Sequence, residues 1–239
     1  MEKFFKQNPI LFLDIETVPQ FPSFNACSEP IQSLWKRKAE LLKKSADETA
    51  EDIYNRAGIY AEFGRIICIS FGYLFFSENE MHLKIKSIFG DDEKVLLESF
   101  ASLLNKSYAS SDSKLCAHNG KEFDFPYIAR RMVINRIPLP VILDTTGKKP
   151  WEVNHLDTLE MWKFGDYKNY TPLNLLTHVL DIPSPKDDID GSQVWSVYWV
   201  DNDLPRIVTY CEKDVEALVN VYLRMKGMPL VSKDFITKV

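Results

Sequence analysis

The chain has 239 residues, 45% of them hydrophobic, which suffices for a sizeable core in one large domain or two small ones. Its 29 basic and 34 acidic residues give a net charge of -5, which excludes the strongly basic surface of a protein that coats duplex nucleic acid. Four cysteines far apart in the sequence, without a CxxC pair, predict reduced and mostly buried thiols.

The first apolar run, from Ile10 to Leu13, leads into two acidic residues, Asp14 and Glu16. It is nearly unbroken, as expected for a strand that is buried on both faces. It is too short, and too close to acidic residues, for a signal peptide. Nowhere do about 18 apolar residues run together, as a membrane span requires. We therefore expect a soluble, cytoplasmic protein without a membrane segment.

The region after this strand is predicted to be a loop followed by a helical insertion. Prolines and serines from Pro19 to Pro30 favour the loop, and an Ala/Lys/Glu-rich stretch at about 31–61 favours the helix. Apolar residues recur in it at intervals of three and four, opposite basic side chains. The apolar stripe comprises Ile31, Leu34, Trp35, Ala39 and Leu42. Two interpretations stay open, a helix packed on the sheet with a solvated basic face or a flap that contacts nucleic acid.

The rest of the chain alternates between predicted strands and helices. Two β-rich runs, 65–76 and 81–89, flank a polar turn and predict a hairpin. There follow a helix opened by acidic residues 91–93, a strand at 114–119, a helix at 125–136, a strand at 153–158, and helices at 172–180 and 204–226. Asp157 is expected to cap a helix, which we favour over a third metal site formed with His155. This order predicts one α/β domain over 1–239, a mixed sheet flanked by helices with the first strand central.

Asp14 and Glu16 form the first candidate functional motif. They are two residues apart, so on a strand both side chains point to the same face. Two neighbouring anions repel each other, and burying either without a partner is costly or forces it to protonate. A divalent cation removes this cost, and oxygen ligands without a nearby His or Cys favour Mg²⁺ or Mn²⁺ over Zn²⁺. Taken alone the pair is weak evidence, because a polar strand end or a salt-bridge partner explains it equally well.

Two further motifs combine acidic and polar residues. Asp124 ends the run NGKEFD at the junction of a predicted strand and helix, where loops of α/β folds present functional groups. It is also suited to cap that helix. Tyr210 and Asp214 are four residues apart, so a helix places the phenol and the carboxylate on one face. An isolated pair of this kind is more often structural.

Taken together and in this order, the three motifs resemble those of the DEDD exonucleases in the ribonuclease-H-like, or DnaQ-like, superfamily. The pattern is D-x-E, then N-x3-F-D, then Y-x3-D. The tyrosine makes the chain similar to the DEDDy branch, since Thr209 stands where the DEDDh branch has a histidine. More narrowly, LFLDIET, AHNGKEFDFP, SPKDDIDGS and YCEKDV look like the stand-alone predicted exonucleases related to the proofreading domain of family B DNA polymerases. The resemblance covers about Pro9 to Lys226.

This resemblance implies a 3'-5' exonuclease whose five-stranded sheet has the order 3-2-1-4-5, with strand 2 antiparallel. It also implies two Mg²⁺ or Mn²⁺ ions, of which Asp14 bridges both and Asp124 holds one through a water. The expected metal ligands are Asp14, Glu16, Asp124 and Asp214. Tyr210 is expected to orient the attacking water, because a phenol with a pKa of about 10 is a poor general base near neutrality. Candidate substrate contacts are Thr17, Asn119, Phe123 and Lys186.

The expected substrate is the 3' end of single-stranded DNA, released as nucleoside 5'-monophosphates. RNA processing stays open, because four carboxylates act on the phosphodiester and do not read the 2'-hydroxyl. Two further alternatives are a catalytically silent nucleic-acid-binding module of the same fold and a proofreading subunit that needs a polymerase partner. The sequence identifies no protein partner.

Overall fold

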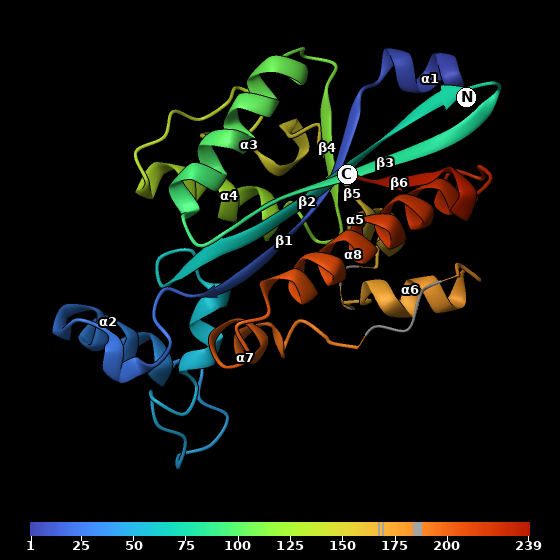
Figure 1. The fold of residues 1–239 in the computed structure, drawn as a ribbon. Coiled ribbons are helices and arrows are strands. Elements are labelled where there is room, and N and C mark those ends of the chain that lie inside the picture. The colour runs from blue at the N-terminus through green and yellow to red at the C-terminus, as the bar shows by residue number, and fades with distance from the viewer. Residues whose placement is uncertain (167, 169, 184–187) are drawn as a thin grey trace.

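The computed structural model describes residues 1–239 except 167, 169 and 184–187. Its centre is a six-stranded mixed sheet in the order β5-β4-β1-β2-β3-β6 (Figure 1). The strands are β1 (Ile10–Pro19), β2 (Gly64–Ser77), β3 (Glu80–Phe89), β4 (Lys114–Ala117), β5 (Leu156–Asp157) and β6 (Ile236–Lys238). Strand β2 is antiparallel to β1 and β3, whereas β4 is parallel to β1. The first five strands confirm the predicted order and the antiparallel second strand.

The sixth strand is the part of the sheet that the prediction missed. Strand β6 lies beside β3 and runs parallel to it, with Leu83 opposite Ile236. With three residues, it is too short to show a recognisable alternation. Helix α1 (Glu2–Gln7) was missed as well, because its six residues are too few to show a helical repeat before the apolar run that begins at Ile10.

Helices cover both faces of the sheet, and the alternation of side chains along β1 decides which helices each residue meets. Leu11, Leu13 and Ile15 pack in one core cluster with α3 (Glu93–Ser107) and α4 (Asp124–Ile134). Ile10 and Phe12 point the other way and pack with α8 (Leu204–Met225). Figure 1 shows α3 and α4 on one side and α8 with α6 (Leu173–Val179) and α7 (Val194–Trp199) on the other. The even-numbered residues of β1 therefore face α8.

The predicted hairpin is confirmed. Strands β2 and β3 pair from Cys68 opposite Phe89 to Ser77 opposite Glu80. The two residues between them, Glu78 and Asn79, have φ values of 53° and 67°. Two successive left-handed residues form the kind of tight turn that matches the twist of the flanking strands.

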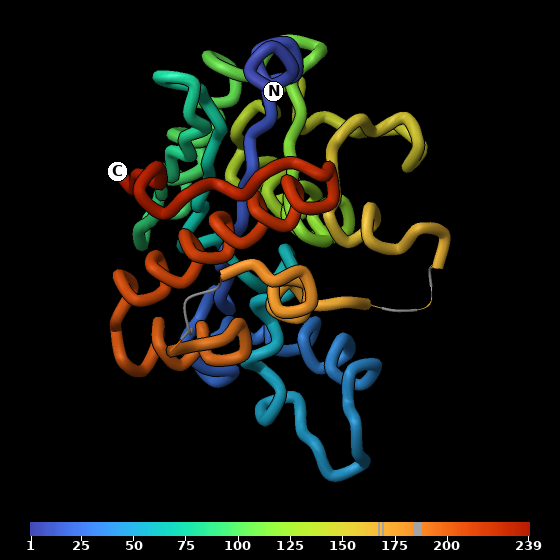
Figure 2. The backbone as a smooth tube through the Cα atoms, turned by 90° about the vertical axis from the view of Figure 1, so that its right-hand side faces the viewer, coloured from blue at the N-terminus to red at the C-terminus, as the bar shows by residue number. Residues whose placement is uncertain are grey.

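The predicted helix at 31–61 is wrong beyond residue 40. Helix α2 spans Glu29–Glu40, with Pro30 in its first turn, and a short 3-10 helix follows at Tyr54–Ile59. The indole of Trp35 is fully buried, and its Nε1 donates a hydrogen bond to the carbonyl of Ala50 at 2.7 Å. This bond requires the chain to fold back after α2. Figures 1 and 2 show the segment after α2 at the end of the molecule opposite α1.

Helix α5 (Thr158–Lys163) begins where capping by Asp157 was predicted, and this prediction is confirmed. Asp157 Oδ1 accepts hydrogen bonds from the backbone N–H groups of Leu159 and Glu160, at 2.9 and 3.3 Å. The backbone N–H of Leu115 donates to Nδ1 of His155. All four cysteines are free and buried, as expected. Among the described residues, no helix is long and apolar enough to cross a membrane.

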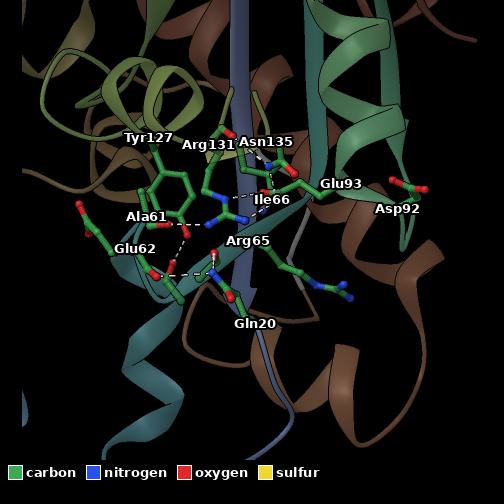
Figure 3. A network of polar contacts seen from close by, with 12 residues as sticks. Gln20, Ala61, Glu62, Arg65, Ile66, Asp92, Glu93, Tyr127, Arg131 and Asn135 are labelled. Atoms are coloured by element: carbon green, nitrogen blue, oxygen red, sulfur yellow. Dashed lines mark hydrogen bonds and ion pairs between the residues drawn. The ribbon is translucent and has the colours of Figure 1, made fainter. Parts of the chain in front are cut away.

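A buried polar network ties α3 and α4 to the start of β2 (Figure 3). Arg131 Nε and Nη2 donate to the two carboxylate oxygens of Glu93, and Arg131 Nη1 donates to the carbonyl of Ala61 at 2.8 Å. Glu93 also accepts from the backbone N–H of Ile66 at 2.8 Å and from Asn135 Nδ2 at 2.9 Å. The network fixes α4, which begins at Asp124, against α3 and the start of β2.

Candidate active site

The five predicted catalytic residues come from three separate parts of the chain and line one cleft of about 1100 Å³. They are Asp14, Glu16, Asp124, Tyr210 and Asp214. The even-numbered face of β1 presents the first two toward α8, since Phe12 on the same face packs edge-on against Tyr222 of that helix. The four-residue spacing on α8 places Tyr210 and Asp214 on one face of the helix, which faces Asp14 and Glu16 across the cleft. The structure therefore brings together what the sequence predicted as one site.

The carboxylates of this cleft repel one another, and those of Glu16 and Asp124 are also buried. Burial, together with the charges of Asp214 and Asp124, raises the pKa of Asp14 well above its usual range. Burial and the neighbouring Asp14 and Asp214 raise the pKa of Glu16 in the same way. Burial raises the pKa of Asp124 to about 7, although backbone N–H groups act against the shift.

The donor set fits divalent cations. Among the described residues that line the cleft there is neither lysine nor arginine, whereas six are acidic: Asp14, Glu16, Asp124, Asp188, Asp190 and Asp214. Several carboxylate oxygens gathered in this way are the ligands that Mg²⁺ and Mn²⁺ prefer.

A thiol also lies beside the carboxylates, and the expectation that no cysteine is near the pair is wrong. Cys211 Sγ lies 3.3 Å from Oδ2 of Asp14 and 3.5 Å from its carbonyl oxygen. One ligand atom from each of Asp14, Glu16 and Cys211 lies within 4.8 Å of the others. No sequence pattern indicates this contact, because Cys211 lies 197 positions from Asp14 and only the packing of α8 on β1 brings them together.

Asp124 is held by a tight loop between β4 and α4. Asn119 adopts a left-handed conformation with φ of 65°, and its backbone N–H donates to Asp157 Oδ1 at 2.9 Å. Gly120 has no room for a side chain, because a Cβ there would lie 2.4 Å from the Cβ of Ala117. Asp124 is the first residue of α4, and the cap position belongs to Phe123. Simple helix capping by Asp124 therefore does not explain its placement.

The four candidate substrate contacts differ in their position relative to the cleft. Asn119 and Phe123 line the cleft, as a contact with substrate requires. Thr17 follows an irregularity in the pairing of β1 with β2 and hydrogen-bonds Tyr127, and it does not line the cleft. Lys186 lies outside the described residues.

One wall of the cleft was not predicted. It includes His118, Tyr170 and residues of α6 such as Asn174 and His178. His118 Nε2 donates to the carbonyl of Thr171 and Nδ1 contacts the hydroxyl of Thr158, both at 2.9 Å. The ring centroid of Tyr170 lies 6.3 Å from that of His118. No spacing rule marks these residues, because they come from a loop and one short helix.

Residues 59–233 match the family of predicted 3'-5' exonucleases related to the exonuclease domain of PolB. The match covers more than half of the chain, which therefore belongs to this family. Strand β1, with Asp14 and Glu16, precedes the matched residues. No curated protein matches the chain.

Solved structures of E. coli exonuclease I are also similar to the chain. Its complex with a dT13 oligonucleotide aligns with a TM-score of 0.42 and 12% identity, over 85% of this chain and 43% of that one. A complex described as ExoI/SSB-Ct aligns with a TM-score of 0.41 and 13% identity, over 85% and 43%. The chain thus spans less than half the length of these structures.

Proposed function

We propose that this chain is a metal-dependent 3'-5' exonuclease domain, extending over residues 1–239, that shortens single-stranded DNA from its 3' end and releases nucleoside 5'-monophosphates. The observation that carries the proposal is the convergence of four carboxylates and one tyrosine from β1, α4 and α8 on one cleft. The family assignment supports the reaction class. DNA is favoured over RNA because the family is related to the exonuclease domain of a DNA polymerase.

The exonuclease family is metal-dependent, and we assign the metal-holding role here to the four carboxylates, Asp14, Glu16, Asp124 and Asp214. Two Mg²⁺ or Mn²⁺ ions bound there would activate the attacking water and stabilise the leaving 3'-oxygen. The raised pKa values of Asp14 and Glu16 support this assignment, since bound cations would relieve the repulsion that causes them.

Tyr210 is proposed to orient the attacking water. Burial and the charges of Asp214 and Glu16 raise the pKa of its phenol, and a hydrogen bond donated to Asp214 adds to the shift. The hydroxyl therefore stays protonated and is unsuited to remove a proton near neutral pH. Asn119 and Phe123, on the α4 side of the cleft, are proposed to contact the sugar and base of the substrate.

Replacing Tyr210 by Phe is expected to slow single-turnover cleavage by about 10-fold, because one orienting hydrogen bond is lost while the carboxylates stay. A general base would contribute about 100-fold to 10,000-fold. The measurement is the rate of 5'-labelled oligonucleotide shortening at saturating Mn²⁺ across pH 6 to 9. A loss as large as that of an Asp14 variant, or a new pH dependence in the variant, would contradict the orienting role.

The experiment that tests the proposed function is a panel of 5'-labelled oligonucleotides, single- and double-stranded, of DNA and RNA, incubated with Mg²⁺, Mn²⁺ or EDTA. We expect a ladder on single-stranded DNA with either cation and none with EDTA. Faster shortening of RNA would identify an RNA-processing enzyme instead. Binding without turnover in both cations would identify a silent module. A ladder that persists in EDTA would overturn the metal-dependent mechanism.

A further inference from the structure

Cys211 lies directly behind the carboxylate cluster, on the side of α8 that packs against β1 and β2. Its side chain is fully buried and shares a small apolar cluster with Val208 and Cys68. Its sulfur nevertheless lies at hydrogen-bond distance, 3.3 Å, from Oδ2 of Asp14. A buried cysteine usually behaves as a small hydrophobic side chain, so its contact with the half-buried carboxylate of Asp14 needs a reason.

A row of polar side chains continues from Cys211 through the layer between β2 and α8. Cys211 packs against Cys68 in this cluster, and Cys68 Sγ lies 3.6 Å from Ser70 Oγ. Ser70 Oγ lies 2.8 Å from Ser87 Oγ, and Ser87 donates to Glu212 at 2.9 Å. The row therefore connects two carboxylates, one at each end.

Counting protons along this row fixes the direction of each hydrogen bond. Every thiol or hydroxyl carries one proton, and Ser87 gives its proton to Glu212. Ser70 must then donate to Ser87, and Cys68 must donate to Ser70. The sulfur of Cys68 is left only as an acceptor toward Cys211.

The proton of Cys211 thus has three acceptors: the neutral sulfur of Cys68, the backbone carbonyl of Asp14 at 3.5 Å and the carboxylate Oδ2 of Asp14 at 3.3 Å. A carboxylate that binds a cation is ionised and is much the strongest of these acceptors, because a charge-assisted bond is roughly twice as strong as a neutral one. A thiol is a weak donor, but the low local dielectric around the fully buried Cys211 side chain strengthens the bond that it makes.

We infer that Cys211 is a positioning residue that donates its S–H to Oδ2 of Asp14 and so fixes the orientation in which this carboxylate meets a divalent cation. The inference rests on the proposed function, because it concerns the same cleft. Outer hydrogen-bond partners of ligating side chains set the direction of the ligand atoms, and losing one costs about 10- to 100-fold in metal affinity. Cys211 would act in this way for Asp14.

The test is direct Mn²⁺ binding, measured by electron paramagnetic resonance on the whole chain without nucleic acid. Cys211→Ala is expected to weaken Mn²⁺ binding by at least about 10-fold, and Cys211→Ser, which keeps a donor, to stay within about 3-fold of the natural chain. The matched control is Cys116→Ala, a fully buried cysteine of β4 that packs in a different core cluster. It also leaves a small cavity and should leave Mn²⁺ affinity unchanged.

The outcomes separate the inference from the proposed function. If the natural chain and Cys211→Ala bind Mn²⁺ equally well, the positioning role is overturned while the metal site stands. If Cys211→Ser is as weak as Cys211→Ala, the hydrogen bond is not the cause and the inference fails. If the natural chain binds no Mn²⁺, the proposed metal site itself is wrong, and the inference falls with it.

Discussion

Replacing Asp14 by Asn is expected to reduce exonuclease activity by at least about 1000-fold, because a metal-holding carboxylate contributes several kcal/mol to stabilisation of the transition state. The change keeps the shape of the side chain and removes its charge. The charges of Asp214 and Asp124 both raise the pKa of Asp14, so its carboxylate belongs to the same cluster as theirs. The measurement is the single-turnover rate on 5'-labelled single-stranded DNA with Mn²⁺.

The same variant should be more stable than the natural chain in EDTA. The pKa of Asp14 is raised in the fold by burial and like charges, so the ionised carboxylate destabilises the metal-free fold at neutral pH. The asparagine removes this repulsion, and the melting temperature in EDTA should rise. Addition of Mn²⁺ should then stabilise the natural chain much more than the variant, because only the natural chain keeps the full site.

Glu122→Gln is the matched control for the loss of an acidic side chain. Glu122 is exposed and belongs to the same loop as Asp124, two residues before it. Its removal should leave the rate, the melting temperature in EDTA and the response to Mn²⁺ unchanged. An Asp14→Asn protein that keeps activity near that of Glu122→Gln would contradict the assignment of this site.

The strand order and the meeting of the three motifs were implied by the resemblance to the DEDD exonucleases, whereas the central first strand and the shared face of Asp14 and Glu16 follow from local patterns. An unbroken apolar strand must lie inside the sheet, and the parity of residues 12, 14 and 16 sends all three to one face. That face packs against α8. Phe12 contacts Tyr222 there, and Asp14 and Glu16 lie near Asp214.

What the sequence left open depends on contacts between distant segments. After α2 the chain folds back to bring the carbonyl of Ala50 to Trp35, a contact that no periodicity reveals. The contact of Cys211 with Asp14 depends on the docking of α8, and the wall formed by Tyr170 depends on a loop. Patterns of three and four residues describe one face of one helix, and they carry no information on which segments meet.

Replacing Arg131 by Met is expected to lower the free energy of unfolding by about 3–5 kcal/mol, the usual effect of removing one partner of a buried ion pair. The side chains of Arg131 and Glu93 are 5% and 8% exposed. The variant leaves the carboxylate of Glu93 buried without its guanidinium and the carbonyl of Ala61 without that donor. Urea unfolding at pH 7 in EDTA gives the measurement.

The matched control is Lys94→Met, which removes a cation from the same region but from an exposed ion pair. Lys94 and Glu98 lie 3.8 Å apart with side chains 59% and 54% exposed, so their loss should change stability by less than about 1 kcal/mol. The double variant Glu93→Leu and Arg131→Met should recover part of the loss, because no charge stays buried. Equal effects of Arg131→Met and Lys94→Met would show that the network in Figure 3 does not stabilise the fold.

Stability and activity should separate in the Arg131→Met protein. Arg131 lies two turns beyond Asp124 on α4, so the network holds the helix but not the carboxylate itself. The loop before α4 is held independently, by the hydrogen bonds that Asp157 accepts from the backbone N–H groups of Asn119 and Lys121. Well below its melting temperature the variant should therefore cleave single-stranded DNA at nearly the natural rate, whereas Asp14→Asn should be stable and inactive.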